Sequence, residues 1–455
     1  MKPRRSLLVP CAVIAMTPLT FASPPQSYVP PIEKAVVYEV NFRAFGPKVG
    51  FAAVKARLPK MKALGVNVIW LMPVQPVGKL RSVGQLGSPY SLADYDSVNP
   101  EFGTSSDLRE FVKAAHKLKM GVILDWVPDH TAWDHAWITA HPDWYLKTPS
   151  GQISIPRGTN WNDVAGLDFS NAAMRTAMIQ SMKGWISNYD IDGFRCDAAD
   201  RMPQTFWKSA MGSLRASTPK KLLMLAEGFA AENYASGFDL TYGWNFNSRL
   251  REIFKGKSAS ELSASAKFEQ RGIPIGAGRL RFTTNHDIAA WEGSEAELYH
   301  TPAGARTAFA ITALYGGVPL IYTGQEVGFS KRIPIFDQSS IDWPLHSEVT
   351  EWMSRLIDFR QRQKALQTGS VSDFSSKDVV AFIRSNDKDE IMVLANVRGQ
   401  SSSTAIPQEN PGEWKDVLAK RTLVVTEQMV LGAHEHLVLQ RRRDPARKLY
   451  EARVR

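Results

Sequence analysis

Continuously apolar runs alternate with amphipathic stretches along most of the chain. Eight such runs carry no strict apolar–polar alternation, which is typical of parallel strands buried on both faces. Between them lie stretches with helical spacing, such as residues 106–120. Eight strands that alternate with helices predict an α/β fold, a (β/α)₈ barrel over residues 35–365. The predicted strands are residues 35–45, 66–73, 121–128, 191–199, 222–229, 238–246, 281–287 and 318–326.

The barrel pattern is interrupted once and then replaced. Residues 131–171, after the third strand, are long, Trp-rich and turn-rich, and we expect them to form a small lid subdomain over the barrel mouth. From 366 to 440, short apolar strands separated by polar turns predict a C-terminal β-sandwich domain. Residues 23–34 are proline-rich and indicate a linker. Residues 441–455 form a basic tail.

The first 22 residues have the order of an export signal: basic residues, an apolar run, then small residues. The run is too short and too broken by proline to indicate a membrane span. We therefore expect a secreted or periplasmic protein, with either the general or the twin-arginine export route open. The chain has two cysteines, Cys11 and Cys196, so removing the signal leaves no intramolecular disulfide. Cys196 is expected to be a small buried residue.

Charge excludes one class of partner. The formal net charge of +10 lies partly in the signal and partly in the basic tail, so the body of the chain is nearly balanced. No basic stripe is interleaved with aromatic residues, and nucleic acid is therefore not an expected partner.

Polar side chains gather at the carboxyl ends of five of the predicted strands, which form the active-site face of such a barrel. Any one of these clusters alone could be a satisfied ion pair, but five in the same relative position favour a shared site. We expect three carboxylates to converge there with three side chains that can carry positive charge. These six are Asp197, Glu227, Asp287, Arg195, His130 and His286.

Converging carboxylates suit a particular reaction. Because like charges cannot all ionise easily when close, one pKa rises and that carboxyl can act as an acid while another stays ionised. Cleavage of a glycosidic bond needs this pair. A zinc or manganese site is the alternative, since His and Asp at strand ends suit those metals. The HExxH and clustered-cysteine spacings are absent, which favours the glycosidase.

Four segments, in order and spacing, resemble the conserved segments of the α-amylase superfamily, glycoside hydrolase family thirteen. Further stretches such as "GVNVIWLMPV" and "IYTGQEVG" extend the resemblance over about residues 35–440. The four segments are "DWVPDH", "GFRCDAAD", "AEGF" and "FTTNHD".

The resemblance implies a role for each catalytic carboxylate. Asp197 would be the nucleophile that forms a glycosyl-enzyme, with Arg195 holding it ionised and oriented. Glu227 would be the acid/base, and Asp287 would bind sugar hydroxyls and favour a distorted ring. The anomeric configuration would be retained.

The resemblance also implies a sugar-binding set. His130 and His286 would hydrogen-bond the same sugar, and Tyr90 would stack beneath its ring, although an ordinary packed aromatic is the alternative there because the segment departs from the family's "GYW". Apolar sugar faces stack on aromatic rings. The lid tryptophans could therefore form subsites or simply the subdomain core: Trp133, Trp137, Trp144 and Trp161.

Two departures bear on calcium and on the leaving-group side. Asp129 stands where the family has a calcium-binding asparagine, and Gly166 stands where it has an aspartate; Asp168 could compensate, but calcium is in doubt. Asp200 and Arg201 replace a lysine and a histidine that contact the leaving-group sugars. Asp200 is expected to form either a salt bridge or a sugar contact, so the leaving-group side differs from that of a typical endo-amylase.

The sequence favours an exported retaining enzyme that hydrolyses α-1,4-glucosidic bonds in starch, maltodextrins or cyclomaltodextrins by double displacement. A transglycosylase, or a hydrolase of a short α-glucoside such as sucrose or trehalose, is the alternative within the superfamily. A non-catalytic glucan-binding homologue is the remote one, and the presence of all three carboxylates argues against it.

Overall fold

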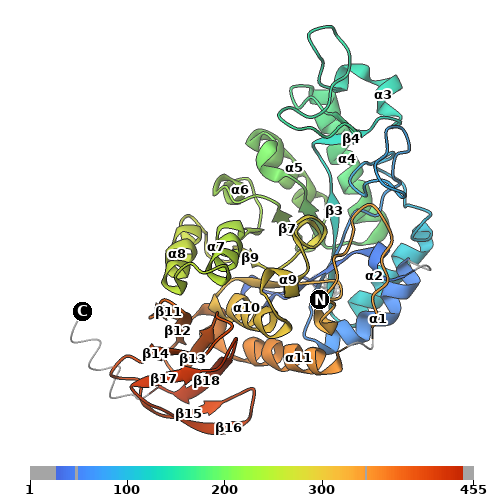
Figure 1. The fold of residues 1–455 in the computed structure, drawn as a ribbon. Coiled ribbons are helices and arrows are strands. Elements are labelled where there is room, and N and C mark those ends of the chain that lie inside the picture. Colours follow the sequence, from blue (N-terminus) through green and yellow to red (C-terminus); the bar gives the residue numbers. More distant parts are fainter. Residues whose placement is uncertain (1–26, 47–49, 344–345, 444–455) are drawn as a thin grey trace, which may run out of the picture.

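Eight parallel strands close into a barrel in the computed structural model, which describes residues 27–46, 50–343 and 346–443 (Figure 1). The predicted export signal, with Cys11, and most of the basic tail lie outside the described residues. The first strand closes the barrel, since Val37 pairs with Val68 on one side and with Leu320 on the other. The predicted (β/α)₈ architecture is confirmed. In barrel order the strands are β1 (Val37–Val40), β2 (Val68–Leu71), β3 (Gly121–Trp126), β6 (Gly193–Cys196), β7 (Leu223–Ala226), β8 (Leu240–Tyr242), β9 (Gly278–Arg281) and β10 (Val318–Tyr322).

The predicted range of the seventh barrel strand, residues 281–287, begins too late in the chain. The structure ends β9 at Arg281, where the predicted strand begins. Its pattern was hidden because Arg279 and Arg281 occupy strand positions with buried guanidinium groups. Arg279 donates to the Glu269 carbonyl, and Arg281 pairs with the Glu269 carboxylate. Residues 282–287 instead lead away from the strand toward the barrel mouth.

Helices surround the barrel (Figure 1). In α2, Thr104 and Asp107 form a capping box at the start, and apolar residues at helical spacing face the strands. Among the described residues no helix is both long and apolar enough to cross a membrane. The longer helices are α1 (Phe51–Ala63), α2 (Ser105–Lys117), α4 (Ala172–Tyr189), α5 (Gln204–Ser217), α7 (Trp244–Phe254), α8 (Leu262–Gln270), α10 (Pro302–Tyr315) and α11 (Ser347–Arg362). The shorter ones are α3 (Trp137–Ala140), α6 (Glu232–Ala235), α9 (Glu295–Leu298) and α12 (Lys364–Thr368).

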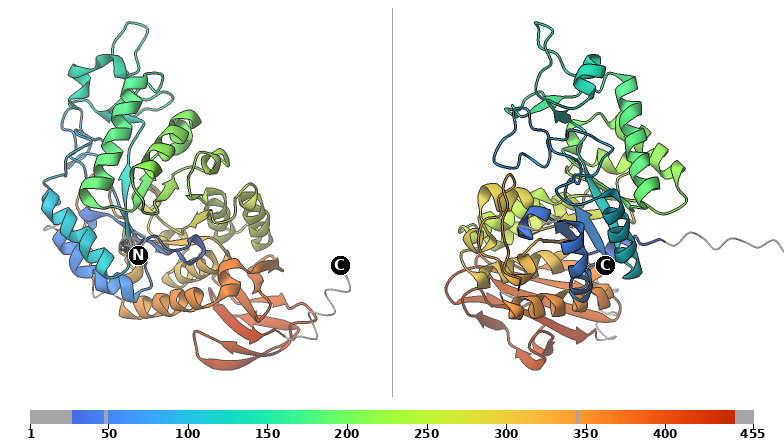
Figure 2. Two further views of the ribbon diagram at one scale, coloured as in Figure 1. Left: turned by 180° about the vertical axis from the view of Figure 1, so that it is seen from behind. Right: turned by 90° about the vertical axis from the view of Figure 1, so that its right-hand side faces the viewer.

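The segment after β3 forms a small unit at the carboxyl ends of the strands. Its strands β4 (His130–Ala132) and β5 (Val164–Gly166) pair antiparallel, with His130 opposite Gly166. All views show this lid standing at the end of the molecule opposite to the C-terminal sheet (Figures 1 and 2).

The C-terminal region is antiparallel and has two layers. One face of its larger sheet packs with β14 and β17 around Met392, Trp414 and Leu431. The other face, with Phe382 and Val393, belongs to the same hydrophobic core as the barrel. The predicted boundary at residue 365 falls inside α12. The larger sheet contains β11 (Ser370–Asp373), β12 (Val379–Ser385), β13 (Asp389–Asn396), β18 (His436–Arg442), β15 (Gly412–Asp416) and β16 (Arg421–Val425), and the smaller contains β14 (Ser402–Ala405) and β17 (Gln428–Leu431).

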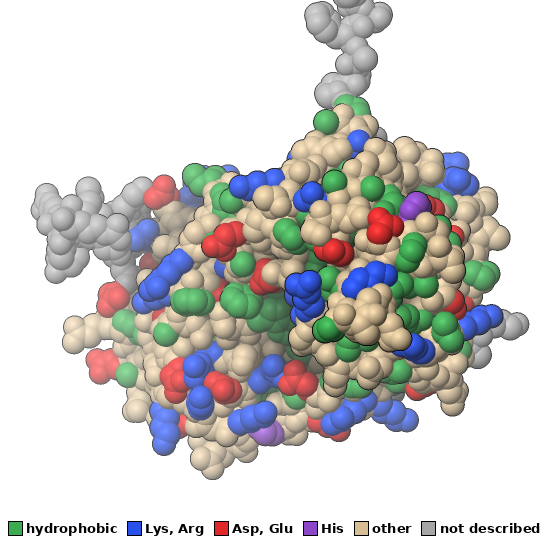
Figure 3. All heavy atoms as spheres, turned by 90° about the horizontal axis from the view of Figure 1, so that it is seen from above, with side chains coloured by type: hydrophobic (Ala, Val, Ile, Leu, Met, Phe, Trp, Pro, Cys, Tyr) green, Lys and Arg blue, Asp and Glu red, His purple; other side chains and the backbone are tan. Residues whose placement is uncertain are grey.

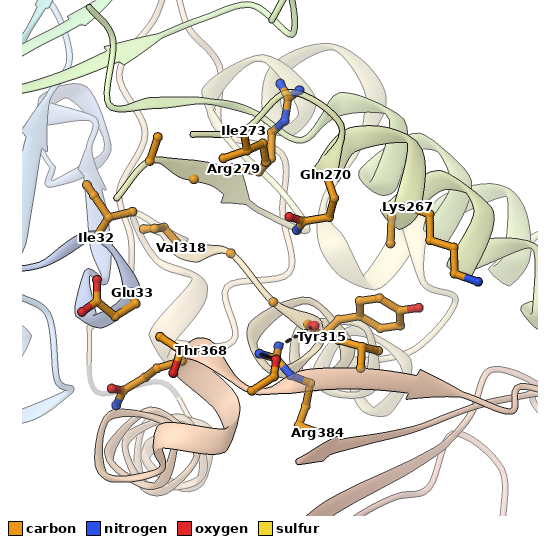
Figure 4. A pocket seen from close by; sticks show the side chains of 18 of the residues that line it. Ile32, Glu33, Lys267, Gln270, Ile273, Arg279, Tyr315, Val318, Thr368 and Arg384 are labelled. Atoms are coloured by element: carbon orange, nitrogen blue, oxygen red, sulfur yellow. Dashed lines mark hydrogen bonds between the residues drawn. The ribbon is translucent and has the colours of Figure 1, made fainter. Parts of the chain in front are cut away.

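Two buried arginines lie near the junction of the barrel and this sheet, and Arg384 joins the two. Arg384 of β12 donates to the Tyr315 carbonyl at the end of α10 (2.7 Å) and to the Gly369 carbonyl (2.9 Å). Arg360 of α11 donates to the Gly317 carbonyl (2.7 Å). Burial lowers the pKa of each guanidinium to about 10. Arg384 and Tyr315 border a cavity of about 970 Å³ between barrel and sheet, which lies at the amino ends of β9 and β10 (Figure 4).

Candidate active site

The predicted site residues lie at the opposite end of the barrel from that cavity, where the strands end. Asp197 follows β6 directly and Glu227 follows β7 directly. Asp287 lies six residues beyond β9. Seen from above, the surface is hollowed near its centre, with hydrophobic, acidic and basic side chains around the hollow (Figure 3).

A single guanidinium, that of Arg195, holds three carboxylates from neighbouring strands. Its Nη1 lies 2.8 Å from Asp125 Oδ1 and 2.7 Å from Asp197 Oδ1. Its Nη2 lies 3.0 Å from Glu227 Oε2, and its Nε donates to the Tyr242 hydroxyl at 3.2 Å. Arg195 is fully buried, so its charge acts on these carboxylates with little screening by water. It therefore compensates a negative cluster that would otherwise be costly to bury.

Asp125 belongs to this cluster and was missed by the sequence reasoning. Its second oxygen accepts hydrogen bonds from Trp70 Nε1 and from the Tyr90 hydroxyl, each at 3.1 Å. Burial raises its pKa to about 6, although Arg195 acts in the opposite direction. A charged residue within the apolar run of β3 was the feature that could have revealed it.

Glu227 has a strongly altered acidity. Burial raises its pKa to about 8, the charges of Asp197 and Asp287 add to the rise, and Arg195 opposes it. Its Oε2 accepts the backbone N–H of Ala198 at 2.7 Å. Ala198 has a left-handed backbone (φ +44°), which turns the chain sharply after Asp197. At neutral pH Glu227 is therefore a protonated acid close to the Asp197 carboxylate.

His286 and Tyr90 form a connected pair beside these carboxylates. The Tyr90 hydroxyl lies 2.8 Å from His286 Nε2, which is also 3.4 Å from Asp287 Oδ2. His286 Nδ1 bonds the buried carboxylate of Glu39, another residue that sequence reasoning missed because it lies within β1. Burial lowers the pKa of His286, but Asp287 and Glu39 outweigh it and raise the value to about 9. The imidazole is therefore cationic at neutral pH.

The other predicted histidine, His130, reaches the cluster through the backbone. His130 Nε2 lies 3.1 Å from the Tyr90 carbonyl, and its buried ring meets the Trp161 ring edge to face at 5.6 Å. Asp287 is the most open of the three carboxylates, with 38% of its side chain exposed. The structure thus brings all seven predicted site residues to one end of the barrel.

The lid tryptophans divide into two groups. Trp137 and Trp144 pack edge to face at 4.8 Å, and Trp144 belongs to the hydrophobic core that the lid shares with the barrel. Trp133 donates to the Asn162 carbonyl and is covered by the Arg81 guanidinium. Only Trp161 among these four is substantially exposed (39%).

Asp200 and Arg201, which follow Asp197, make contacts in different parts of the structure. Asp200 accepts the Phe229 N–H at 2.9 Å and the Asn233 side-chain amide at 2.6 Å, so it orders the loop after Glu227. It forms no ion pair within the described part of the chain, and the salt-bridge expectation was wrong because its partners are neutral donors. Arg201 turns toward the lid. Cys196 is buried, as expected.

The alternative of a metal site gains no support from the geometry. Within residues 27–46, 50–343 and 346–443, no three His, Cys, Asp or Glu side chains are arranged to hold a metal ion. The cluster around Arg195 is instead neutralised by a guanidinium, which suits acid–base and nucleophilic chemistry.

Comparison with known proteins decides the family. The family model described as "Alpha amylase, catalytic domain" matches residues 50–405. The chain belongs to the α-amylase family. The resemblance inferred from the four segments is therefore confirmed.

Alignments with curated α-amylases extend over most of the chain. It is 26% identical to α-amylase MalA of Haloarcula japonica over 84% of this chain and 58% of that protein. It is 25% identical to α-amylase 2 of Dictyoglomus thermophilum over 80% of this chain and 66% of that protein. The chain thus spans about three fifths to two thirds of the length of these curated relatives.

A solved structure agrees with the fold. The maltogenic α-amylase AmyB of Thermotoga neapolitana superposes with a TM-score of 0.82 at 27% identity, over 91% of this chain and all of that one.

Proposed function

We propose that the chain is a retaining glycoside hydrolase that cleaves α-1,4-glucosidic bonds in starch, maltodextrins or cyclomaltodextrins. The observation that carries the proposal is the pairing of two unlike carboxyl groups. Asp197 is held by Arg195 at 2.7 Å, while burial and neighbouring charge raise the pKa of Glu227 to about 8. An ionised nucleophile beside a protonated acid is what double displacement requires.

The first step breaks the glycosidic bond. An Asp197 carboxylate oxygen attacks the anomeric carbon while Glu227 donates its proton to the departing sugar oxygen, so a glycosyl ester forms and the leaving sugar departs neutral. As that bond breaks, positive charge develops on the sugar, and the exposed carboxylate of Asp287 stabilises it.

The second step releases the product. Glu227, now ionised, takes a proton from a water molecule, whose oxygen attacks the anomeric carbon and displaces Asp197. Two inversions give retention of configuration. Glu227 ends protonated and Asp197 ionised, so the cycle closes without any other reactant than water.

Relatives support a glucan substrate and keep one alternative open. Besides the α-amylases, the chain is similar to a cyclomaltodextrinase of Thermoanaerobacter pseudethanolicus and to an α-1,4-glucan:maltose-1-phosphate maltosyltransferase of Rhodospirillum rubrum. If a second sugar replaces water in the second step, the same residues perform transglycosylation.

A substrate panel with products separated over time tests the proposal. The panel contains starch, pullulan, cyclomaltodextrin, maltose, sucrose and trehalose. We expect new reducing ends from the α-1,4-glucans, released as the α anomer when observed by NMR. Release of the β anomer, or no product from any glucan, would refute it. Disproportionation to longer glucans without net reducing ends would favour the transferase.

We also infer export, on the basis of the basic, apolar and small-residue order of residues 1–22. Amino-terminal sequencing of the protein recovered from medium or periplasm is expected to begin near residue 23. An intact first methionine on protein found only in the cytoplasm would contradict export.

The pH profile is expected to lose activity on the alkaline side as Glu227 ionises. Because its pKa is raised to about 8, the acid needed in the first step is present below that pH and absent above it. We expect kcat/KM on a maltodextrin to fall tenfold per pH unit above about 8. A profile that stays flat to pH 10 would contradict the assignment.

Trp161 is expected to provide a sugar-stacking surface. Its exposed ring stands against His130, and loss of one stacking contact costs about 1 kcal/mol, or roughly fivefold in binding. W161A should raise KM for maltodextrins about fivefold with little change in kcat, while W161F, which keeps a ring, should raise it less. Equal KM values for W161A and the wild type would exclude the contact.

A further inference from the structure

The side chain of Arg201 joins three segments that meet beside the active site. It belongs to the short turn η4 (Ala199–Arg201), four residues after the Asp197 nucleophile. Its Nε donates to Asp129 Oδ2 at 3.0 Å, and its Nη2 donates to the Arg157 carbonyl of the lid at 2.8 Å. One guanidinium therefore bridges the segment after β6, the segment after β3 and the lid.

The family resemblance implies a calcium ion in this region, and the donor set does not fit one. Calcium takes six to eight oxygen ligands. The carboxylate of Asp129 and the carbonyl of Arg157 already accept hydrogen bonds from Arg201, whose permanent positive charge would repel a second cation. The Asp168 carboxylate accepts the Ser170 N–H at 2.9 Å.

The packing around Gly166 leaves no room for a calcium-binding carboxylate at this position. A Cβ atom added there would lie 2.9 Å from Pro156 N and 2.9 Å from Leu146 Cδ1. Two lid segments therefore occupy the space into which an aspartate at this position would project. The packing of the lid is built for glycine, so the missing carboxylate is a property of the whole local fold.

We propose that the Arg201 guanidinium takes the place of a divalent cation in fixing the lid to the barrel, so that lid docking needs no metal. A guanidinium carries a permanent charge and several donors in a fixed plane, which lets it satisfy a carboxylate and a carbonyl together. Arg201 is then a positioning residue. Asp129 adjoins His130, and the turn that carries Arg201 adjoins Ala198, whose N–H bonds Glu227.

The inference rests on these contacts and not on the proposed reaction, so the first test needs no substrate. The melting temperature and the rate of trypsin cleavage within the lid are measured for the mature wild type in excess EDTA and in excess calcium. We expect neither to change. A fall in melting temperature or faster lid cleavage in EDTA, reversed by calcium, would overturn the proposal.

Variants then test the guanidinium itself. R201M keeps the length of the side chain without its charge, and we expect faster trypsin cleavage of the lid and a lower melting temperature. R157K is the matched control, since it changes the exposed side chain at the same contact but keeps both the accepting carbonyl and the trypsin site, and it should behave as wild type. R201M that resembles R157K in both measurements would refute the bridge.

Kinetics separate positioning from mere stability. Because the lid carries Trp161 and adjoins His130, R201M should raise KM on maltodextrins about tenfold, with a smaller change in kcat. R201K, which keeps the charge but cannot reach both acceptors in the same plane, should recover part of the loss. If R201M does not fold, D129N, which weakens the same bridge, should show the lid cleavage and KM changes to a smaller degree; wild-type values for D129N would refute the role. Inactivity of the wild type on every glucan would refute the proposed function and leave the cleavage and melting results to decide the bridge.

Discussion

Replacing Asp197 by asparagine is expected to lower kcat on every α-glucan by on the order of 10⁴-fold or more, with the protein still folded. The amide is a poor nucleophile, so no glycosyl ester can form. The substitution keeps the size of the side chain, and Arg195 keeps Asp125 and Glu227 as partners. Reducing-sugar release and melting curves measure the two effects.

D200N is the matched control for that experiment. Asp200 lies three residues further along the same segment and accepts only neutral donors, Phe229 N–H and the Asn233 amide. We expect D200N to retain activity within about tenfold of wild type, since one neutral hydrogen bond contributes about 1 kcal/mol. Activity of D197N close to that of D200N would remove Asp197 from the reaction.

Replacing Glu227 by glutamine is expected to act differently according to the leaving group. Glutamine cannot donate a proton, so cleavage of a maltodextrin should fall about 10³-fold or more. A maltosyl fluoride releases fluoride without needing that proton, so the first step should survive. Without a base to activate water the second step should stall, and mass spectrometry should find a maltosyl group on the protein. Equal loss on both substrates, with no adduct, would exclude Glu227 as the acid/base.

Although E227Q is expected to lose activity, it is expected to be more stable than the wild type at high pH. Burial raises the Glu227 pKa from 4.5 to about 8 in the folded protein. Its contribution to stability is therefore full below pH 4.5 and is lost as pH rises through 8. Because glutamine does not ionise, E227Q should unfold with a free energy larger than wild type by about 2 kcal/mol at pH 9 and by less at pH 5. Denaturant unfolding at the two pH values measures the difference.

The parts of the fold that sequence predicts well are those in which local pattern and tertiary burial agree. β3 and β10 are continuous apolar runs, and parallel strands covered on both faces require such runs. The prediction of β9 was wrong because Arg279 and Arg281 are buried there. Their partner is Glu269 on α8, and no local sequence pattern indicates that contact.

The site residues likewise divide into those that the sequence predicts and those that depend on long-range contacts. Asp197, Glu227 and Asp287 follow strands, where carboxylates at the mouth can be expected from topology alone. Asp125 and Glu39 lie inside strands, and their presence in the site depends on which way each strand faces in the closed barrel. Long-range contacts of this kind follow from the assembled fold and not from sequence spacing.

The buried side chain of Arg384 makes the C-terminal sheet part of the same structural unit as the barrel. Arg384 lies on β12, beyond the predicted end of the catalytic barrel, yet it caps the carbonyl at the end of α10. Exchanging the C-terminal sheet for one without this arginine would leave that carbonyl without its donor, at a cost of about 1–3 kcal/mol. Losing the sheet would also uncover the Tyr315 ring, against which Phe382 packs. The barrel and the C-terminal sheet are therefore expected to unfold together in a single transition, because neither can be separated without exposing the core they share.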